Sequence, residues 1–182
     1  VSYFTNMELS RHIGKTSIEK RMVVHNGVDL DVFKYDANSS FPRSGIVCVS
    51  SADTIDRLRV KGLDLFMAVA RKLPDEDFTI IGVSGAAKTE LASYGLLNVT
   101  LLGNIDRKAL GDVFRKTKLI CQFSRYESFG MALAEGMLCG CIPVTVKGIG
   151  AAEIVDGHSG VVADSANPES LTKAVKCGLN LP

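Results

Sequence analysis

Short β-rich runs alternate with helical patterns from Gly45 onward, and this rhythm limits the fold more than any other feature of the chain. Such alternation is typical of a parallel sheet with helices on both faces. The runs expected to form strands are residues 45–49, 78–83, 99–103, 119–124, 142–146 and 160–164. The sequence therefore predicts an α/β fold: a Rossmann-like, doubly wound parallel sheet of about six strands.

The segments between these runs carry helical patterns, and some also carry start signals. Asp106 is placed to open one helix, and Asn167, followed by Pro168, is placed to open the last. The expected helices are residues 61–73, 87–95, 106–117, 129–138 and 167–180. Each of the first four would connect the end of one strand to the start of the next, and the last would follow the final strand.

The first 44 residues do not follow this rhythm. Residues 6–13 read as a helix, and 21–29 as a strand that runs into a turn at Asn26-Gly27. Residues 34–45 read as a polar linker. We therefore expect residues 1–44 to be a junction and residues 45–182 to be the main domain.

Composition excludes several classes of function. The chain has 21 lysines and arginines against 20 aspartates and glutamates, so no overall field favours nucleic acid or an anionic membrane. No apolar run approaches the ~20 residues of a membrane span. The cysteines lack paired metal-site spacing and read as buried reduced thiols, which predicts a cytoplasmic protein; they are Cys48, Cys121, Cys139, Cys141 and Cys177.

In a sheet of this kind, ligands bind at the carboxyl ends of the strands, and "RYESFGMALAEG" follows one such end. We expect Glu127 in the connecting loop and Glu135 about two turns into the helix. The amides of Phe129, Gly130 and Met131 would face an anionic group, because a helix N-terminus presents unpaired N–H groups. The two carboxylates would accept hydrogen bonds from sugar hydroxyls. Alternatively, Glu127 favours the helix dipole and Glu135 is a solvated helical residue.

A second cluster of charge lies in the loop expected after the first strand. Arg57, Arg59 and Lys61 offer positive charge at the same edge of the sheet, where a diphosphate would need it. The alternative is a solvated basic loop. The sequence has neither GxGxxG nor GxxxxGK[ST], so a dinucleotide fingerprint and a P-loop are both disfavoured.

Four stretches in order resemble the retaining glycosyltransferases of family 4, which have the GT-B fold of two Rossmann-like domains facing across a cleft. They are "VVHNGVDLDVF" at 23–33, "VKGLDLF" at 60–66, "VTLLGNIDRKALGDVF" at 99–114 and "SRYESFGMALAEGMLCGCIPVTV" at 124–146. The Glu-x7-Glu motif of that family matches Glu127 and Glu135. The resemblance implies that residues 45–182 are the C-terminal, nucleotide-sugar-binding domain and that residues 1–44 join it to an N-terminal acceptor domain.

The resemblance also implies roles for single residues. Glu127 would contact the transferred sugar, and Glu135 would hold the ribose. Lys61 would neutralise the diphosphate, and the backbone near Ile105 would read the base. The amides of residues 129–131 would meet the diphosphate or the sugar.

One position departs from the family pattern. Gly-Arg usually follows the first strand, where this chain has Ser50-Ser51. Arg57 could supply the missing charge from further along the loop, or one phosphate contact could be absent. The role of Arg57 is therefore open.

The implied activity is transfer of a hexose from a nucleotide-diphosphate sugar to a glycan, lipid or small molecule, with retention of configuration and without a metal. The isolated chain would bind the donor and transfer poorly, since the acceptor binds the N-terminal domain. The partners would be the nucleotide sugar and this acceptor, with no nucleic acid; peripheral membrane association of the longer protein stays open. Two alternatives are a non-catalytic nucleotide-sugar binding module and a GT-B sugar-nucleotide epimerase.

Overall fold

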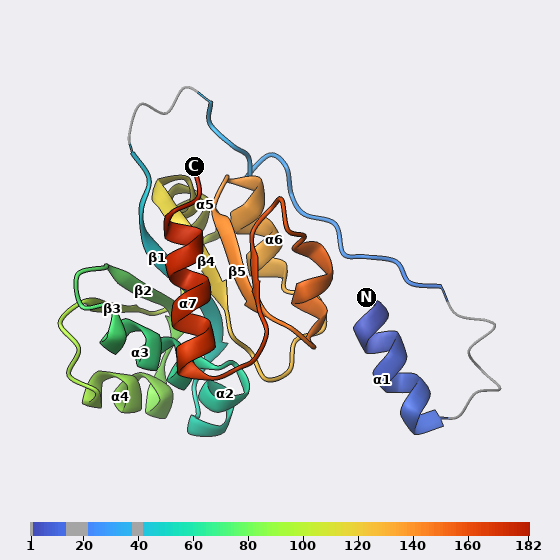
Figure 1. Cartoon of the computed structure of the whole chain (residues 1–182), viewed down its shortest axis with the longest axis horizontal. Coiled ribbons are helices and arrows are strands. Elements are labelled where there is room, and N and C mark those ends of the chain that lie inside the picture. The colour runs from blue at the N-terminus through green and yellow to red at the C-terminus, as the bar shows by residue number, and fades with distance from the viewer. Residues whose placement is uncertain (1, 14–21, 38–41) are drawn as a thin grey trace.

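The computed structural model describes residues 2–13, 22–37 and 42–182, and its centre is a parallel sheet (Figure 1). Six strands in these ranges pair in the order β3-β2-β1-β4-β5-β6. The strands are β1 (Ser44–Ala52), β2 (Phe78–Val83), β3 (Val99–Leu102), β4 (Thr117–Gln122), β5 (Ile142–Val146) and β6 (Val161–Ala163). All pairs are parallel. This is the doubly wound order, so the predicted fold class is confirmed.

Helices cover both faces of the sheet, as parallel crossover connections require. In Figure 1, α7 (Pro168–Leu179) lies across one face and packs on α3 (Leu63–Lys72), while α5 (Arg107–Lys116) and α6 (Met131–Leu138) pack together on the other. The helix α4 (Gly85–Ser93) lies beside α3. The strands are buried between these layers, and Ile80, Leu119 and Val144 are fully enclosed.

The two predicted helix starts are confirmed. The carboxylate of Asp106 accepts a hydrogen bond from the Ala109 amide at 2.8 Å, and Asn167 accepts one from Ser170 at 2.9 Å. Each side chain thereby satisfies a backbone donor that the first turn of a helix leaves unpaired. Pro168 occupies the first turn of α7.

The helix expected at 61–73 is instead two helices. A short helix, α2 (Ile55–Val60), precedes α3, and Lys61 and Gly62 separate them. Gly62 has a φ of 66°, and a β-carbon there would lie 2.0 Å from the carbonyl oxygen of Phe123. Only glycine allows the chain to turn this close to the end of β4. The expected basic loop is therefore largely helical, with Lys61 at the C-terminus of α2.

The N-terminal segment differs from the prediction. The helix α1 (Tyr3–Ile13) begins three residues early because the carboxylate of Glu153 accepts hydrogen bonds from the amides of Tyr3 and Phe4. The strand expected at 21–29 is wrong for residues 22–29, which have no regular structure and pair with no strand in the described ranges. Of the expected linker at 34–45, residues 38–41 lie outside the described residues.

The cysteine prediction holds for four of the five residues. The exception is Cys177, which is exposed on α7; the buried thiols are Cys48, Cys121, Cys139 and Cys141. Burial raises the pKa of Cys48 and of Cys141 to about 12, so both are neutral thiols near pH 7.

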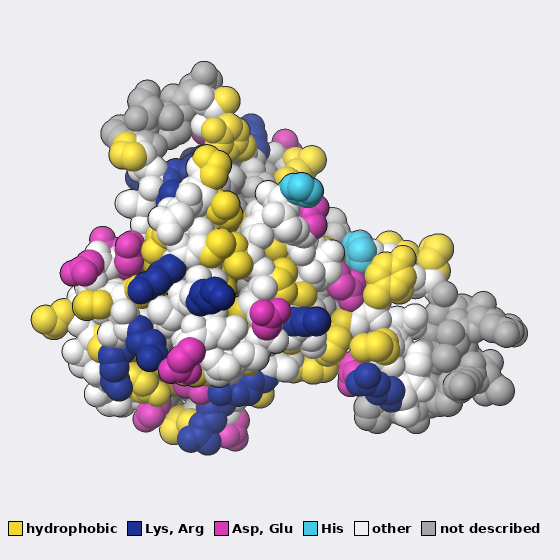
Figure 2. Space-filling view, viewed as in Figure 1, with side chains coloured by type: hydrophobic (Ala, Val, Ile, Leu, Met, Phe, Trp, Pro, Cys, Tyr) yellow, Lys and Arg dark blue, Asp and Glu magenta, His cyan; other side chains and the backbone are white. Residues whose placement is uncertain are grey.

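The surface carries both signs of charge. Figure 2 shows basic and acidic side chains interspersed on the face covered by α3 and α7, as the near-balance in composition predicts. Among the described residues, no helix combines the length and apolar character needed to cross a membrane.

Candidate functional site

A cleft of about 360 Å³ lies at the carboxyl edge of the sheet, beside α2. It is formed by the last residues of β1, by α2 and Lys61, by the end of β4 and by the loop that leads into α6. Its lining is Asn26, Val49, Ser50, Ser51, Arg57, Lys61, Gln122, residues 127–132 and Glu135. The structure thus brings together both predicted glutamates, the predicted lysine, Arg57 and the predicted start of α6.

Two glycines shape the loop that carries Glu127. Gly130 is the N-cap of α6 with a φ of 88°, a left-handed conformation that favours glycine. Gly150 donates its amide to the carbonyl of Glu127 at 2.8 Å, and a β-carbon on Gly150 would lie 1.9 Å from the carbonyl oxygen of Ser128. The 3-10 helix η2 (Gly150–Ile154) therefore supports this loop from outside, and residues 148–160 do not line the cleft.

An arginine fixes the same loop to the α2–α3 junction. The guanidinium of Arg125 makes two 2.8 Å hydrogen bonds to the carboxylate of Asp64 and a third to the carbonyl of Arg59. The backbone amide of Arg125 also donates to the carbonyl of Val60 at 2.8 Å. These contacts hold the C-terminus of α2, and so Lys61, next to the Glu127 loop. Sequence reasoning missed Arg125 and Asp64, because nothing in their spacing links residues 61 positions apart.

Three donors hold the carboxylate of Glu127. Its Oε2 atom lies 2.9 Å from Lys61 Nζ and 2.8 Å from Gln122 Nε2. Its Oε1 atom accepts a hydrogen bond from the Ser128 amide at 3.1 Å. The side chains of Lys61 and Glu127 are 25% and 16% exposed, so this ion pair is partly shielded from water. Gln122 was also missed; the available signal was one polar residue within the apolar run "LICQF".

Glu135 lies about one turn into α6, so the expected two turns are wrong. The reason is that residues 123–130 form a non-helical loop, with bends at 125–126 and 128–129, and the helix begins only at Met131. The Glu135 side chain is 11% exposed, and its Oε1 atom lies 3.7 Å from Arg107 Nη2. Burial raises the pKa of Glu135, and Arg107 opposes this shift in part. A solvated helical glutamate is therefore excluded.

Two other predicted residues have weaker links to the cleft. Arg57 lines it from α2, but its side chain is 59% exposed and its Nε atom lies 3.9 Å from Asp53. Ile105 is half-buried between β3 and α5, packs against the core and is not part of the cleft lining. Ile105 therefore lies outside the lining that the other candidate residues share.

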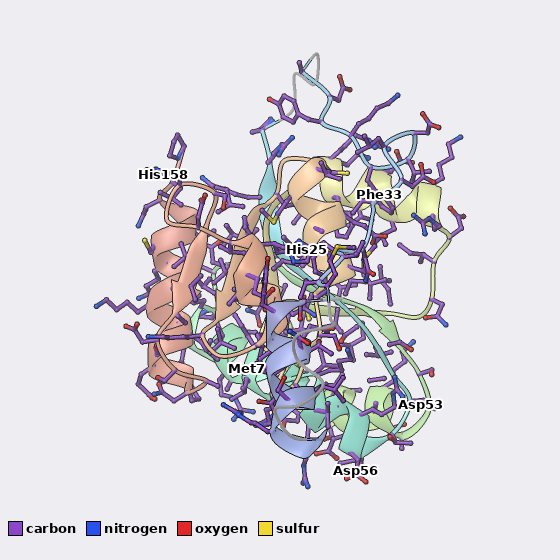
Figure 3. The ribbon with its side chains drawn as sticks, turned by 90° about the vertical axis from the view of Figure 1, so that its right-hand side faces the viewer. Met7, His25, Phe33, Asp53, Asp56 and His158 are labelled. Atoms are coloured by element: carbon purple, nitrogen blue, oxygen red, sulfur yellow. The ribbon has the colours of Figure 1, made fainter. Side chains whose placement is uncertain are left out.

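The described histidines form no ligand set. Figure 3 shows His25 and His158 well apart, His25 near α1 and His158 on a turn beyond η2. The imidazole of His25 packs on the Phe129 ring with centroids 5.4 Å apart, and so supports the cleft loop from behind.

Comparison with known proteins identifies the family. The pattern of glycosyl transferases group 1 matches residues 54–181. A relative from Methanocaldococcus jannaschii, the uncharacterized glycosyltransferase MJ1178, is 25% identical over 180 residues, which cover 96% of this chain and 47% of that protein. The D-inositol 3-phosphate glycosyltransferase of Mycolicibacterium smegmatis is 31% identical over 163 residues, 78% of this chain and 36% of that protein. The chain therefore spans about a third to a half of these relatives.

Solved structures share the fold. The Anabaena protein HepE, solved with UDP and glucose, has a TM-score of 0.77 and 20% identity, covering 98% of this chain and 52% of that one. The C-terminal domain of the group 1 glycosyl transferase LpcC from Francisella tularensis has a TM-score of 0.66 and 20% identity, covering 85% and 89%. The sheet matches the Rossmann-like domains of GT-B glycosyltransferases. With most of its length matched by the family pattern, the chain belongs to the glycosyl transferases group 1.

Proposed function

We propose that this chain is the donor-binding domain of a retaining, family 4 glycosyltransferase, which transfers a hexose from a nucleotide-diphosphate sugar. The observation that carries the proposal is that Lys61, Glu127, Glu135 and the start of α6 line one cleft. Acidic side chains suit hydroxyls, while a lysine and helix amides suit phosphates. The UDP and glucose found with HepE, and the named activity of the mycobacterial relative, support the same ligand class.

The ligand would lie along the cleft with its sugar at Glu127 and its ribose at Glu135. Lys61 and residues 129–131 line the same cleft, and the diphosphate would bind between this ammonium and the amides at the start of α6. Arg57 would add charge at the rim, in place of the family arginine. The backbone near Ile105 would read the base, which would extend beyond the cleft lining.

The reaction follows from where charge develops. Breaking the bond between the anomeric carbon and the diphosphate places negative charge on the leaving oxygen. The Lys61 ammonium and the helix amides, placed beside that charge, would lower the barrier, and so the reaction would need no metal. Retention would then follow from front-face attack by the acceptor, with Glu127 positioning the sugar rather than forming a glycosyl-enzyme bond. Chelation by EDTA is accordingly expected to leave activity unchanged.

The domain assignment is part of the proposal. The overlap with 89% of the isolated LpcC C-terminal domain supports residues 45–182 as the donor-binding half, with residues 1–44 as the junction. The acceptor glycan, lipid or small molecule would bind an N-terminal domain of a longer, cytoplasmic protein. By this account the chain alone binds the donor and transfers poorly.

One observation favours a second candidate, a nucleotide-sugar binding module without transferase activity. Ser50 and Ser51 line the cleft where the family usually has Gly-Arg. Serine offers a neutral hydroxyl, so less positive charge is available to stabilise the leaving diphosphate than an arginine would provide. Binding would survive this loss better than turnover.

The first experiment tests donor binding directly. The chain would be melted with UDP, GDP, ADP and with UDP-glucose, GDP-mannose and ADP-glucose. We expect one base to raise the melting temperature, because a ligand that binds only the folded state stabilises it. Lys61→Met should abolish most of this shift. Lys173→Met, on the exposed side of α7, is the matched control and should retain it.

A second experiment separates the two candidates. The longer parent protein would be assayed for radiolabelled sugar transfer, with and without Glu127→Ala. Turnover that depends on Glu127 supports the transferase. Donor binding without turnover for any sugar supports the binding module, and no binding to any of the six ligands contradicts both.

A further inference from the structure

The last residue of β4, Gln122, is polar, although the residues on either side of it are apolar. Gln122 is 7% exposed, lines the cleft and directs Nε2 to Glu127 Oε2 at 2.8 Å. Its neighbours in the sequence, Cys121 and Phe123, are each 1% exposed. Burying an amide at this position requires a reason, because an unpaired polar group is costly in the core.

The orientation of the Gln122 amide is fixed by its partner. An ionised carboxylate only accepts hydrogen bonds, so the NH₂ group must face Glu127 and the amide oxygen must face away. That oxygen, Oε1, is buried and has no hydrogen-bond partner among the described residues. A flipped amide would place two acceptors together. Glu127 therefore gains a donor, and Gln122 leaves its own acceptor unsatisfied.

The backbone of Gln122 is held within the sheet. Gln122 pairs with Thr145 of β5, and the Thr145 hydroxyl donates to the Gln122 carbonyl at 3.0 Å. A site supported from a strand holds its geometry better than one supported from a loop. The donor to Glu127 is therefore fixed to the sheet, whereas the ammonium of Lys61 is carried on a flexible four-carbon chain.

Under the proposed function, the ammonium of Lys61 has two competing partners, Glu127 and the diphosphate. In the empty cleft its ammonium pairs with Glu127 Oε2 at 2.9 Å. A bound diphosphate would attract the same ammonium with more negative charge, and so weaken its contact with Glu127. Gln122 is neutral and gains much less from the phosphates. Its hydrogen bond to the same oxygen would persist when the lysine turns away.

We propose that Gln122 is a positioning residue that keeps Glu127 aligned for the sugar after Lys61 has moved to the diphosphate. This inference rests on the proposed function and adds to it a residue outside the Glu-x7-Glu motif. The side-chain hydrogen bond of Gln122 is made to Glu127, so Gln122 should matter for the sugar part of the donor and not for the nucleotide part. A residue with a merely structural role would affect both parts equally.

The test compares a nucleoside diphosphate with its own sugar nucleotide by titration calorimetry. The probes are UDP with UDP-glucose, GDP with GDP-mannose, or ADP with ADP-glucose, whichever base binds the wild-type chain. Gln122→Met keeps the length of the side chain and removes its polar atoms. We expect about tenfold weaker binding of the sugar nucleotide, unchanged binding of the diphosphate, and a melting temperature at least as high as wild type.

Two further variants sharpen the test. Gln122→Glu replaces the donor with a second acceptor beside Glu127, so sugar-nucleotide binding should fall further at pH 7.5. It should recover in part as the pH falls, because adjacent carboxyls share a proton. Thr145→Val is the matched control: it removes the other hydrogen bond at this position, which does not touch Glu127. It should lower stability without a selective loss of sugar-nucleotide affinity.

The outcomes separate the two proposals. If the wild-type chain binds the diphosphate and the sugar nucleotide, but Gln122→Met binds both as wild type does, the inference about Gln122 is wrong and the proposed function stands. Equal losses for both ligands would also overturn it, as they indicate a structural role. If the wild-type chain binds none of the six probes, the proposed function fails, and the inference about Gln122 fails with it.

Discussion

The two glutamates of the cleft differ in how their charges are held. Glu127 has an ammonium at 2.9 Å, an amide nitrogen at 2.8 Å and a backbone amide at 3.1 Å. Glu135 is less exposed, yet the cation facing it is Arg107 at 3.7 Å, whose own side chain is 60% exposed. Glu127 is thus compensated within the protein, whereas Glu135 is buried with weaker compensation.

This difference suggests different tasks. A carboxylate has about four acceptor sites, and three donors already occupy most of those on Glu127. Glu127 is therefore fixed in one orientation and can accept little more, which suits precise placement of one sugar hydroxyl. Glu135 keeps more of its acceptor capacity for a ligand, which suits a pair of ribose hydroxyls. The predictions below test this contrast.

The largest effect is expected from Gly130→Ala, which would disturb the Glu127 end. A β-carbon there would lie 2.8 Å from Gln122 Oε1 and 2.9 Å from the β-carbon of Ala151, at a φ of 88°. We expect a loss of about 2–4 kcal/mol of stability, seen as a fall of roughly 5–15 °C in the melting temperature. Gly157→Ala is the control, since a β-carbon there meets nothing within 4 Å. Equal melting temperatures for both variants would contradict the close packing described.

A smaller effect, of opposite sign for stability, is expected from Glu135→Gln. Burial raises the pKa of Glu135, so the folded state binds this proton more tightly than the unfolded chain does. The resulting stabilisation is present at acid pH and is lost as the pH rises through the raised pKa. At pH 7.5 the substitution should therefore raise the melting temperature by about 1–3 °C, while weakening diphosphate binding about tenfold. A melting temperature below wild type would show that Arg107 more than offsets the burial.

The smallest effect is expected from Arg107→Gln. The Arg107 side chain is 60% exposed, so water screens its interaction with Glu135, and the pair should contribute at most about 1 kcal/mol. Its removal should raise the pKa of Glu135 further, because the cation lowers it. Diphosphate affinity should be within about threefold of wild type at pH 8. As the pH is lowered from 8, the affinity of the variant should begin to fall at a higher pH than that of wild type. Identical pH profiles would show that Arg107 does not influence Glu135.

Much of the fold could be predicted because its signals are local. Strand β2 was predicted to the residue, and the caps at Asp106 and Asn167 follow from side chains next to the amides they bind. The division of residues 55–72 into two helices could not be predicted, since it depends on the approach of Gly62 to Phe123 across 61 positions. The start of α1 depends in the same way on the distant Glu153.

The candidate site was predictable in part for the same reason. Lys61 and Glu127 come after predicted strand ends, and Glu127 and Glu135 match the Glu-x7-Glu motif. All three residues line one cleft. The residues that fix their geometry, Arg125 and Gln122, act through contacts that no spacing reveals. Ile105 was placed by resemblance alone and lies outside the cleft lining.

The most direct measurement of the central claim is a crossed calorimetric titration of Glu127→Gln and Glu135→Gln with one nucleoside diphosphate and its sugar nucleotide. We predict that Glu127→Gln keeps wild-type affinity for the diphosphate and binds the sugar nucleotide about tenfold more weakly, while Glu135→Gln weakens both ligands by similar factors. Equal losses for both ligands in Glu127→Gln, or a loss confined to the sugar nucleotide in Glu135→Gln, would contradict the orientation proposed for the donor.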